Sequence, residues 1–418
     1  MRILFLTHRV PFPLDRGDRI RAYHLLRFLA SRADVSLACV SQETTPDASR
    51  KALAALCERV AIEPTSRSVR AVHSSLSLLA GGSATEGYFW SPLLNTTLTR
   101  WAEDTRFDAV VCFCSGMYRY CVQPSLSEVP TIVDVVDVDS QKWSECAANA
   151  RMPFSWIRRW ESHRVAKLER RIAAFASDIF LISEDERSLF QRVTGHSAAA
   201  VATNGVDIEH FGESLKSHPE PRTCVFLGVL NYQPNVDAVM WFARHIWPGV
   251  RCRFTDARLR IVGRNPTAEV QALSKCAGIE VNANVPDVRP YLANSEVAVA
   301  PLRIARGVQN KVLESMAAGL PVVATPAALA GLKVEKGSDA ICADSVDEWQ
   351  SAIETLFTDT ERRRLIAANG RAYVEKHHNW NQTLTPFGDA LARVDACYRE
   401  HDPSVQRHEG EAKEMCVS

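Results

Sequence analysis

Residues 306–325 read RGVQNKVLESMAAGLPVVAT and place two charged side chains at the start of a predicted helix. Gly307 lies in a polar loop, and a helical pattern follows in which Lys311 and Glu314 are three residues apart. Gly319 ends this pattern, and the run PVVAT that follows has the composition of a buried strand. Side chains three residues apart lie on the same side of a helix, so the stretch predicts a strand–loop–helix unit that presents a lysine and a glutamate together.

The same alternation of apolar runs and helical segments extends over most of the chain. The strand candidates are RILFLT, VSLACV, VAIEP, DAVVCF, TIVDVV, DIFLIS and AAVAT in the first half, and CVFLGVL, RLRIVG, IEVNAN, VAVAPL and PVVAT in the second. Strands that alternate with helices favour parallel sheets covered on both faces. Two such series predict an α/β protein with two doubly wound, Rossmann-like domains, and the polar segment ESLKSHPEPR (213–222) indicates a linker near their junction.

The composition is that of a globular protein, with 418 residues, 46% hydrophobic residues and a formal net charge of +0. This balance argues against a nucleic-acid-binding protein, and no apolar run approaches the ~20 residues of a membrane span. Prolines soon follow MRILFLTH without a cleavage site, so we expect a first strand and no signal peptide. The 12 cysteines show no paired zinc spacing, and we expect Cys112 and Cys114 to be free thiols in a reducing cytoplasm.

Residues 151–175 (RMPFSWIRRWESHRVAKLERRIAAF) predict a long helix with two tryptophans and many arginines. One interpretation is a helix with one core face and one solvated basic face. The other is a helix that contacts anionic lipid headgroups. The sequence favours the first interpretation and leaves the second open.

The loop before Lys311 has the features of a phosphate site. In open α/β sheets, ligands bind beyond the carboxyl ends of strands, and helix N-termini attract anions. Gly307 allows close approach of the backbone, while Lys311 and Arg303 supply positive charge. The carboxylate of Glu314 can accept hydrogen bonds from two neighbouring ribose hydroxyls. The residues therefore indicate a nucleoside diphosphate site, and the alternative is a solvated Lys–Glu pair on a helix surface.

Three segments resemble the retaining glycosyltransferases of family 4, which have the two-domain GT-B fold. They are LISEDERSLF with VATNGVDIEHF (181–190 and 201–211), VFLGVLNYQPNVDAVMWFARHIWP (225–248) and PLRIARGVQNKVLESMAAGLPVVAT (301–325). Together with THRVPFPLDRGDRIRAYHLLRFLA (7–30), the chain is most similar to sugar transferases associated with bacterial exosortase and exopolysaccharide systems. The resemblance covers about residues 1–390.

This resemblance implies two domains that face each other across a cleft. It places the acceptor-side domain at 1–205, the nucleotide-sugar domain at 206–380, a helix that returns to the first domain at 381–400 and a disordered tail at 401–418. Family 4 transfer retains anomeric configuration and needs no metal or cofactor. The implied catalytic residues are Lys311, Asp137 and Arg303. The implied donor-binding residues are Gly228, Arg264, Arg306, Gly307, Val308, Gln309, Asn310 and Glu314. The implied acceptor-side residues are His8, Arg16, Gly17 and Asp18.

The chain departs from the family pattern at several positions. The first of two family glutamates falls on Arg306, and the family's cations after the first strand of the second domain are replaced around Val229 and residues 233–235. We therefore expect Arg264, Arg303 and Lys311 to supply the positive charge. Asp137 matches the aspartate of a family histidine–aspartate pair, and the alternative is a loop aspartate that caps the following helix.

Two other patterns suggest metal ligands. Asp137 and Asp139 spell a DxD motif, and His377 and His378 are adjacent. A lone DxD is common by chance, and neighbouring residues on a helix point in different directions. We therefore expect no metal site, and we expect both histidines to lie on the surface.

The sequence thus predicts a cytoplasmic enzyme that moves a hexosyl unit from a UDP- or GDP-sugar to a glycan or lipid-linked acceptor. It also suggests peripheral contact with the cytoplasmic face of the inner membrane. The alternatives are a nucleotide-sugar-binding protein that has lost catalysis and a GT-B epimerase acting on a UDP-sugar.

Overall fold

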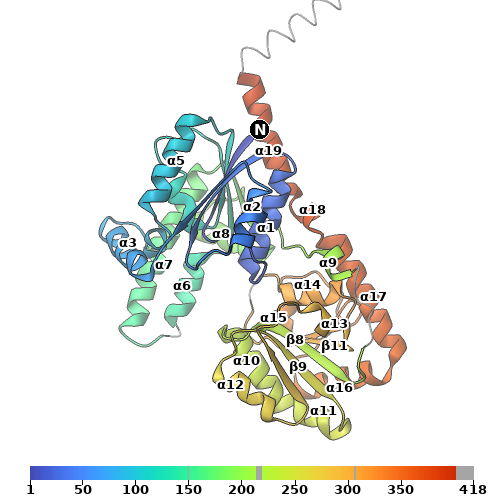
Figure 1. Cartoon of the computed structure of the whole chain (residues 1–418). Helices are drawn as coiled ribbons and strands as arrows, with labels where there is room; N and C mark the ends of the chain where they lie inside the picture. Colours follow the sequence, from blue (N-terminus) through green and yellow to red (C-terminus); the bar gives the residue numbers. More distant parts are fainter. Residues whose placement is uncertain (149, 213–218, 306, 402–418) are drawn as a thin grey trace, which may run out of the picture. The chain divides into compact units, whose positions relative to one another are not determined.

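The computed structural model describes residues 1–148, 150–212, 219–305 and 307–401. The chain divides into two compact units (Figure 1). Unit 1 comprises Met1–Ala202 and the described chain from Leu384 on, and unit 2 comprises Thr203–Thr383. Both are parallel α/β units, as the alternation of strands and helices predicts.

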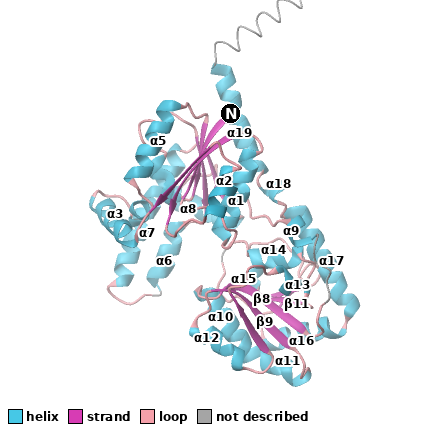
Figure 2. Ribbon diagram, in the orientation of Figure 1, coloured by secondary structure: helices cyan, strands magenta, loops and turns pink. Residues whose placement is uncertain are grey.

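Unit 1 contains a parallel sheet with the strand order β3-β2-β1-β4-β5-β6-β7. The strands are β1 (Arg2–Thr7), β2 (Asp34–Ser41), β3 (Arg59–Pro64), β4 (Ala109–Phe113), β5 (Thr131–Val136), β6 (Asp178–Leu181) and β7 (Ala200–Val201). Helices lie on both faces of the sheet (Figure 2), so its central strands are buried on both sides and are apolar without alternation. The strand order reverses between β1 and β4, which makes this the switch point of the sheet.

The helices of unit 1 are α1 (Gly17–Ala30), α2 (Asp47–Ala54), α3 (Arg67–Leu79), α4 (Ala84–Tyr88), α5 (Pro92–Asp104), η1 (Ser115–Tyr120), α6 (Asp139–Ala148), α7 (Phe154–Phe175), α8 (Glu184–Thr194) and α19 (Thr385–His401). The last of these, α19, returns to unit 1 at the end of the described chain. Its Phe387 packs on Phe180 of β6 with ring centroids 4.2 Å apart. The predicted disordered tail is 401–418; its first residue, His401, is the last residue of α19, and 402–418 lies outside the described residues.

Unit 2 has the strand order β10-β9-β8-β11-β12-β13, again with parallel pairing. The strands are β8 (Thr223–Val229), β9 (Arg258–Arg264), β10 (Ile279–Ala283), β11 (Val297–Ala300), β12 (Val322–Ala324) and β13 (Ile341–Cys342). The helices are α9 (Ile208–Gly212), α10 (Gln233–Trp241), η2 (Phe242–Ile246), α11 (Trp247–Arg253), α12 (Ala268–Ala272), η3 (Leu273–Lys275), α13 (Arg289–Ala293), α14 (Asn310–Ala317), α15 (Pro326–Leu329), α16 (Val346–Thr358), α17 (Thr360–His377) and α18 (Trp380–Thr383). The switch point lies between β8 and β11.

All twelve predicted strand runs contain strands of the structure. The sequence did not indicate β13, because two residues are too few to show a strand pattern. Cys112 and Cys114 are free thiols, as expected, although only Cys112 is fully buried. Of the helices that the structure describes, none is long and apolar enough to cross a membrane.

The segment Asn204–Asp207 packs against the end of α17. The backbone N–H of Val206 donates to the carbonyl of His378 (2.7 Å), and Nδ1 of His378 lies 2.7 Å from the carbonyl oxygen of Asn204. The prediction that both adjacent histidines lie on the surface is wrong for His378, which is 4% exposed, while His377 is exposed. The reason is this contact, which joins segments far apart in the sequence and has no local pattern.

Acid should destabilise unit 2 through His378. Burial lowers the pKa of His378 below its ordinary value of about 6.5. Its contribution to the free energy of unfolding is therefore complete above pH ~6.5 and declines as the pH falls toward the lowered pKa. We expect His378→Gln to flatten the fall in unfolding free energy between pH 7 and 5, as measured by denaturant titration of the full chain. His377→Gln is the matched control, and equal slopes for the two variants would contradict the assignment.

Candidate functional site

In unit 2, the polar residues of the opening stretch lie at the switch point of the sheet. β11 ends at Ala300, a loop follows, and α14 begins at Asn310. The N-cap residue of α14 is Gln309, and its side chain makes no capping hydrogen bond to the helix. The parallel register aligns the carboxyl ends of β8 and β11 at the edge where α14 starts. The predicted strand–loop–helix unit is therefore present.

Lys311 is held at the end of β8. Its Nζ donates to Oδ1 of Asn235 (2.5 Å) and lies 4.4 Å from the centre of the Phe226 ring. Nδ2 of Asn235 in turn donates to the carbonyl of Val229 (2.9 Å), so the amide is anchored to the strand end. A Cβ atom at Gly228 would lie 3.1 Å from Nζ of Lys311 and 2.8 Å from Nδ2 of Asn235. Glycine at 228 therefore leaves the space that the lysine occupies.

Lys311 and Glu314 do not form a plain surface pair. Both side chains are partly buried, and the lysine bonds to Asn235. Burial lowers the pKa of Lys311 to about 7, and the neighbouring Glu314 offsets only part of this shift. Burial also raises the pKa of Glu314 to about 7, against the effect of Lys311. An anion that arrives beside Lys311 would favour its protonated form. Binding of a phosphate near neutral pH would therefore increase the fraction of Lys311 that carries a charge.

The loop before α14 brings backbone close to this pair. Gly307 has a φ of +58°, a left-handed conformation that favours glycine. A Cβ at Gly331 would lie 2.4 Å from the carbonyl oxygen of Gly307, so two backbone segments are close here. The side chain of Val308 is buried in the core, and Oδ1 of Asn310 accepts a hydrogen bond from Nδ2 of Asn204 (2.9 Å). Arg306 lies outside the described residues.

The other predicted cations of unit 2 are arranged differently. Arg303 is exposed and makes a two-pronged ion pair with Asp237 of α10, with Nε donating to Oδ2 (2.9 Å). Its charge is therefore already balanced by a carboxylate. Arg264 is an exposed residue that ends β9, and its backbone carbonyl accepts from the N–H of Leu230 (2.7 Å). The sequence pattern located the segment 233–235, which includes Asn235, but it indicated neither the contact of Asn235 with Lys311 nor the ion pair of Asp237 with Arg303.

In unit 1, His8 and Asp18 meet at the switch point. Nε2 of His8 lies 3.3 Å from Oδ2 of Asp18, which also accepts from Nη1 of Arg9 (2.9 Å). The His8 ring stacks on Phe113, with centroids 5.7 Å apart. Burial disfavours the imidazolium, but Cys114 and Asp18 outweigh this effect and raise the pKa of His8 to about 9. The switch point of unit 1 thus places a buried histidine beside the carboxylate of Asp18.

The acceptor-side loop residues have distinct positions around this histidine. Gly17 is the first residue of α1, Arg16 is its extended N-cap residue, and Asp18 lies in the first helical turn. Burial opposes ionisation of Asp18, but its hydrogen bond with His8 and the charge of Arg9 hold its pKa well below the usual range. Cys114, which follows β4, has a φ of +70°, an uncommon conformation for a residue other than glycine.

The DxD motif of unit 1 holds a lysine. Nζ of Lys142 lies 2.7 Å from Oδ2 of Asp137 and 3.3 Å from Oδ1 of Asp139. Although burial opposes it, the two carboxylates keep the pKa of Lys142 above its usual value. The two aspartates already have an ammonium group between them, so Asp137 is a charge-paired residue at the end of β5. Among the described residues, no group of three or more acidic, histidine or cysteine side chains is arranged to hold a metal ion.

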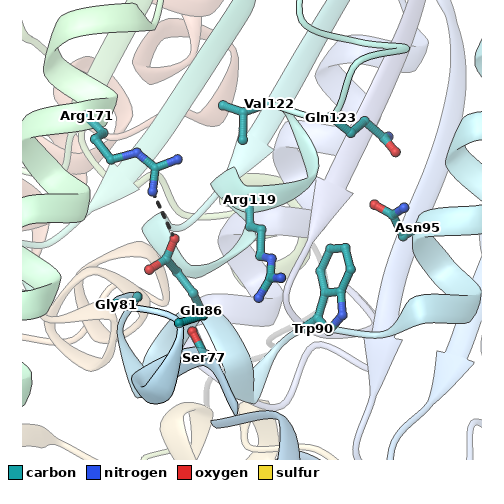
Figure 3. Close-up of a pocket in the computed structure, with 11 residues that line it drawn as sticks. Ser77, Gly81, Glu86, Trp90, Asn95, Arg119, Val122, Gln123 and Arg171 are labelled. Carbon is teal, nitrogen blue, oxygen red and sulfur yellow. Dashed lines mark ion pairs between the residues drawn. The ribbon is translucent and has the colours of Figure 1, made fainter. Parts of the chain in front are cut away.

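Unit 1 also contains a pocket of about 490 Å³ that the sequence did not indicate (Figure 3). It is lined by Ser77, Ala80, Gly81, Gly82, Glu86, Trp90, Asn95, Arg119, Val122, Gln123 and Arg171. Arg119 lies 4.1 Å above the Trp90 ring. Nε2 of Gln123 is buried and has no hydrogen-bond partner among the described residues. Arg171 pairs with Glu86 at 3.5 Å, as the dashed line in Figure 3 shows. The pocket therefore offers hydrogen-bond donors to a ligand rich in oxygen atoms.

Comparison with known proteins supports the importance of the unit 2 site. Residues 221–359 match the family model for glycosyl transferases group 1. This segment includes Gly228, Asn235, Lys311 and Glu314. No curated protein matches the sequence.

Solved structures match nearly the whole chain. Anabaena Alr3699/HepE in complex with UDP and glucose is 15% identical, covers 94% of this chain and 100% of its own, and has a TM-score of 0.64. Sucrose-phosphate synthase from Thermosynechococcus elongatus is 12% identical, covers 95% and 99%, and has a TM-score of 0.69. WaaG, a glycosyltransferase involved in lipopolysaccharide biosynthesis, is 13% identical, covers 92% and 98%, and has a TM-score of 0.61. The chain therefore has the GT-B fold of two Rossmann-like domains, and its residues 221–359 carry the sequence pattern of group 1 glycosyltransferases.

Proposed function

We propose that the protein is a glycosyltransferase that moves a hexosyl unit from a nucleoside diphosphate sugar to a glycan or lipid-linked acceptor, with retention of configuration. The observation that carries this proposal is the position of Lys311, beside Asn235 and Gly228 at the N-terminus of α14. It lies within the segment that matches the glycosyl transferases group 1 model. Three of the similar solved structures, all of Anabaena Alr3699/HepE, contain UDP or UDP-glucose, so UDP-sugars are the first donors to test.

In this proposal, unit 2 stabilises the departing diphosphate. The bond between the sugar and the diphosphate breaks, an acceptor oxygen bonds to the sugar, and the proton of the acceptor hydroxyl passes to the departing diphosphate. Lys311 and the N-terminus of α14 place positive charge where the phosphate oxygens gain negative charge. Glu314, one turn later, accepts hydrogen bonds from the ribose hydroxyls. These residues need no metal ion to neutralise the leaving group, and we propose none.

The biological setting that fits this activity is exopolysaccharide or other cell-surface glycan synthesis. We place the enzyme in the cytoplasm, with peripheral contact at the cytoplasmic face of the membrane. The pocket of unit 1 is the proposed acceptor site, because its donors suit hydroxyl or phosphate oxygens. Asp137, held by Lys142, is proposed to contact the reacting sugar or the acceptor hydroxyl.

A second candidate is a nucleotide-sugar-binding protein without catalysis. The pairing of Arg303 with Asp237 favours it, because this arginine cannot add net charge to a leaving diphosphate while the pair is intact. Binding of a nucleotide sugar with neither transfer nor slow hydrolysis of the donor would support this second candidate.

Nucleotide binding tests the donor site directly. We expect one nucleoside diphosphate out of UDP, GDP and ADP to stabilise the full chain, by about 2.7 kcal/mol at a concentration of 100 times its dissociation constant. Glu314→Ala should weaken this binding, and Lys311→Met should abolish transfer from the matching donor sugar. Glu269→Ala and Lys275→Met change exposed residues of the same unit and are the matched controls. Near-normal turnover by Lys311→Met would refute its role.

The affinity for the nucleoside diphosphate should depend on pH. The free protein has a Lys311 pKa of about 7, and a bound diphosphate raises it by favouring the ammonium form. Binding should therefore take up a proton above pH 7, and the dissociation constant should rise with pH until the pKa of the complex is reached. Calorimetry in buffers of different ionisation enthalpy measures this uptake. Lys311→Arg, whose side chain stays charged, should bind the nucleotide without proton uptake. Equal proton uptake by the wild-type protein and this variant would contradict the assignment.

Substitutions in the pocket of unit 1 should lower the efficiency of transfer to the acceptor and leave binding of the donor unchanged. Arg119→Ala removes a charged donor, so we expect roughly a tenfold or greater loss of transfer efficiency toward the acceptor. Hydrolysis of the donor sugar without acceptor and binding of the nucleotide should be unchanged. Arg100→Ala, an exposed arginine on α5, is the control. A parallel loss of donor hydrolysis would instead indicate a structural role for Arg119.

A further inference from the structure

The tip of the hairpin formed by α6 and α7 carries a cluster of exposed apolar side chains. α6 and α7 pack against each other, and Figure 1 shows them as a hairpin at one side of unit 1. Five large side chains at the tip are exposed: Met152 (72%), Phe154 (63%), Trp156 (73%), Ile157 (52%) and Trp160 (44%). Soluble surfaces seldom gather so many large apolar groups in so short a stretch, and such patches mark interaction sites.

This tip differs from the rest of α7. From Glu161 onward the helix has the expected core face, with Val165, Leu168 and Ile172 buried. Glu161 itself is buried and accepts hydrogen bonds from the backbone N–H groups of Ala84 and Thr85, both at 2.8 Å. In the first two turns, by contrast, most of the side chains are exposed. The interpretation of α7 as a helix with one core face and one solvated basic face is therefore wrong for residues 154–160.

The charge at the tip is entirely positive. Residues 146–160 (CAANARMPFSWIRRW) contain arginines at 151, 158 and 159 and no aspartate or glutamate. Arg151 and Arg159 are exposed, and Arg158 bonds to the carbonyl of Cys146 (2.9 Å). Tryptophan and arginine together are the residues that favour the headgroup region of a bilayer, where the ring is half-buried and the guanidinium meets phosphate.

A second exposed apolar stripe adjoins the base of this region. Val69, Val72, Leu76 and Leu79 of α3 are exposed and follow helical spacing, so they share one face. Arg164 of α7 lies 4.7 Å above the Trp160 ring and donates to the carbonyl of Gly82 (3.3 Å), in the loop after α3. Arg164 therefore joins α7, next to Trp160, to the loop that follows the stripe of α3.

We propose that the hairpin tip, defined as Arg151, Met152, Phe154, Trp156, Ile157, Arg159 and Trp160, inserts into the anionic surface of a lipid bilayer. Phe154, Trp156, Ile157 and Trp160 share one broad face of the first two turns of α7, about 160° wide at 3.6 residues per turn, and the exposed Arg159 borders this face. A fluid headgroup layer can surround all of them, and its phosphates complement the arginines. The partner of this surface is the membrane. The membrane contact follows from the exposed side chains, and it rests on the proposed glycosyltransferase function only for the reason that the enzyme would need a membrane.

The test is flotation of the full-length protein with vesicles of phosphatidylcholine, with and without phosphatidylglycerol. We expect binding to the anionic vesicles that declines with salt. Ile157→Ser should weaken binding. Leu365→Ser on α17 is the matched control, because both side chains are 52% exposed in the native chain, and it should leave binding unchanged. Arg151→Gln and Arg159→Gln should each weaken binding roughly fivefold at low salt, and Arg364→Gln is the control.

Three results would overturn this proposal. The first is an absence of vesicle binding. The second is vesicle binding that changes with neither the content of anionic lipid nor the salt concentration. The third is a dimer in solution that Trp156→Ser dissociates. The failure of the donor site is distinguishable from these results. A chain that binds anionic vesicles through the tip but binds no nucleotide would refute the proposed function and leave the membrane surface intact.

Discussion

Parallel pairing in both sheets is the constraint on which the arrangement of this protein depends. Parallel strands need crossover connections, and these place helices on both faces of each sheet. All loops that leave the carboxyl ends of the strands then meet at one edge. In unit 1 this edge brings together His8, Cys114 and Asp137, and in unit 2 it brings together Gly228 and Lys311. The same geometry therefore positions the polar residues of both units, although their side chains differ.

At the unit 2 edge, desolvation decides the chemistry. Lys311 lies over the Phe226 ring and has one neutral hydrogen-bond acceptor, Asn235. Removing an ammonium group from water is costly, and a neutral amide compensates for only part of that cost, so the pKa falls to about 7. In the proposed function, an arriving diphosphate would supply the missing counter-charge. Electrostatic stabilisation that is arranged before the ligand arrives is the kind that lowers barriers most effectively, because little reorganisation follows.

The sequence was sufficient for the fold and for part of the site. The strands could be predicted because buried parallel strands form continuous apolar runs, and α14 could be placed by its loop and its terminal glycine. The hydrogen-bond and ion-pair partners of the charged residues could not be predicted in this way. Lys311 and Asn235 are 76 positions apart, and Arg303 and Asp237 are 66 apart, so each contact depends on how the strands are ordered in the sheet. The buried state of His378 and the pocket around Arg119 are tertiary in the same way.

Composition alone also concealed the distribution of charge. The chain has 49 basic and 49 acidic residues, and this balance argues against general affinity for polyanions. Within it, acidic side chains are placed beside particular cations, as in the pairs of Arg303 with Asp237 and of Lys142 with Asp137. The hairpin tip is different, because residues 146–160 contain only arginines as charged residues and expose aromatic rings beside them. A neutral protein can therefore carry a local basic and apolar surface, and the burial of each side chain distinguishes that surface from an ordinary solvated helix.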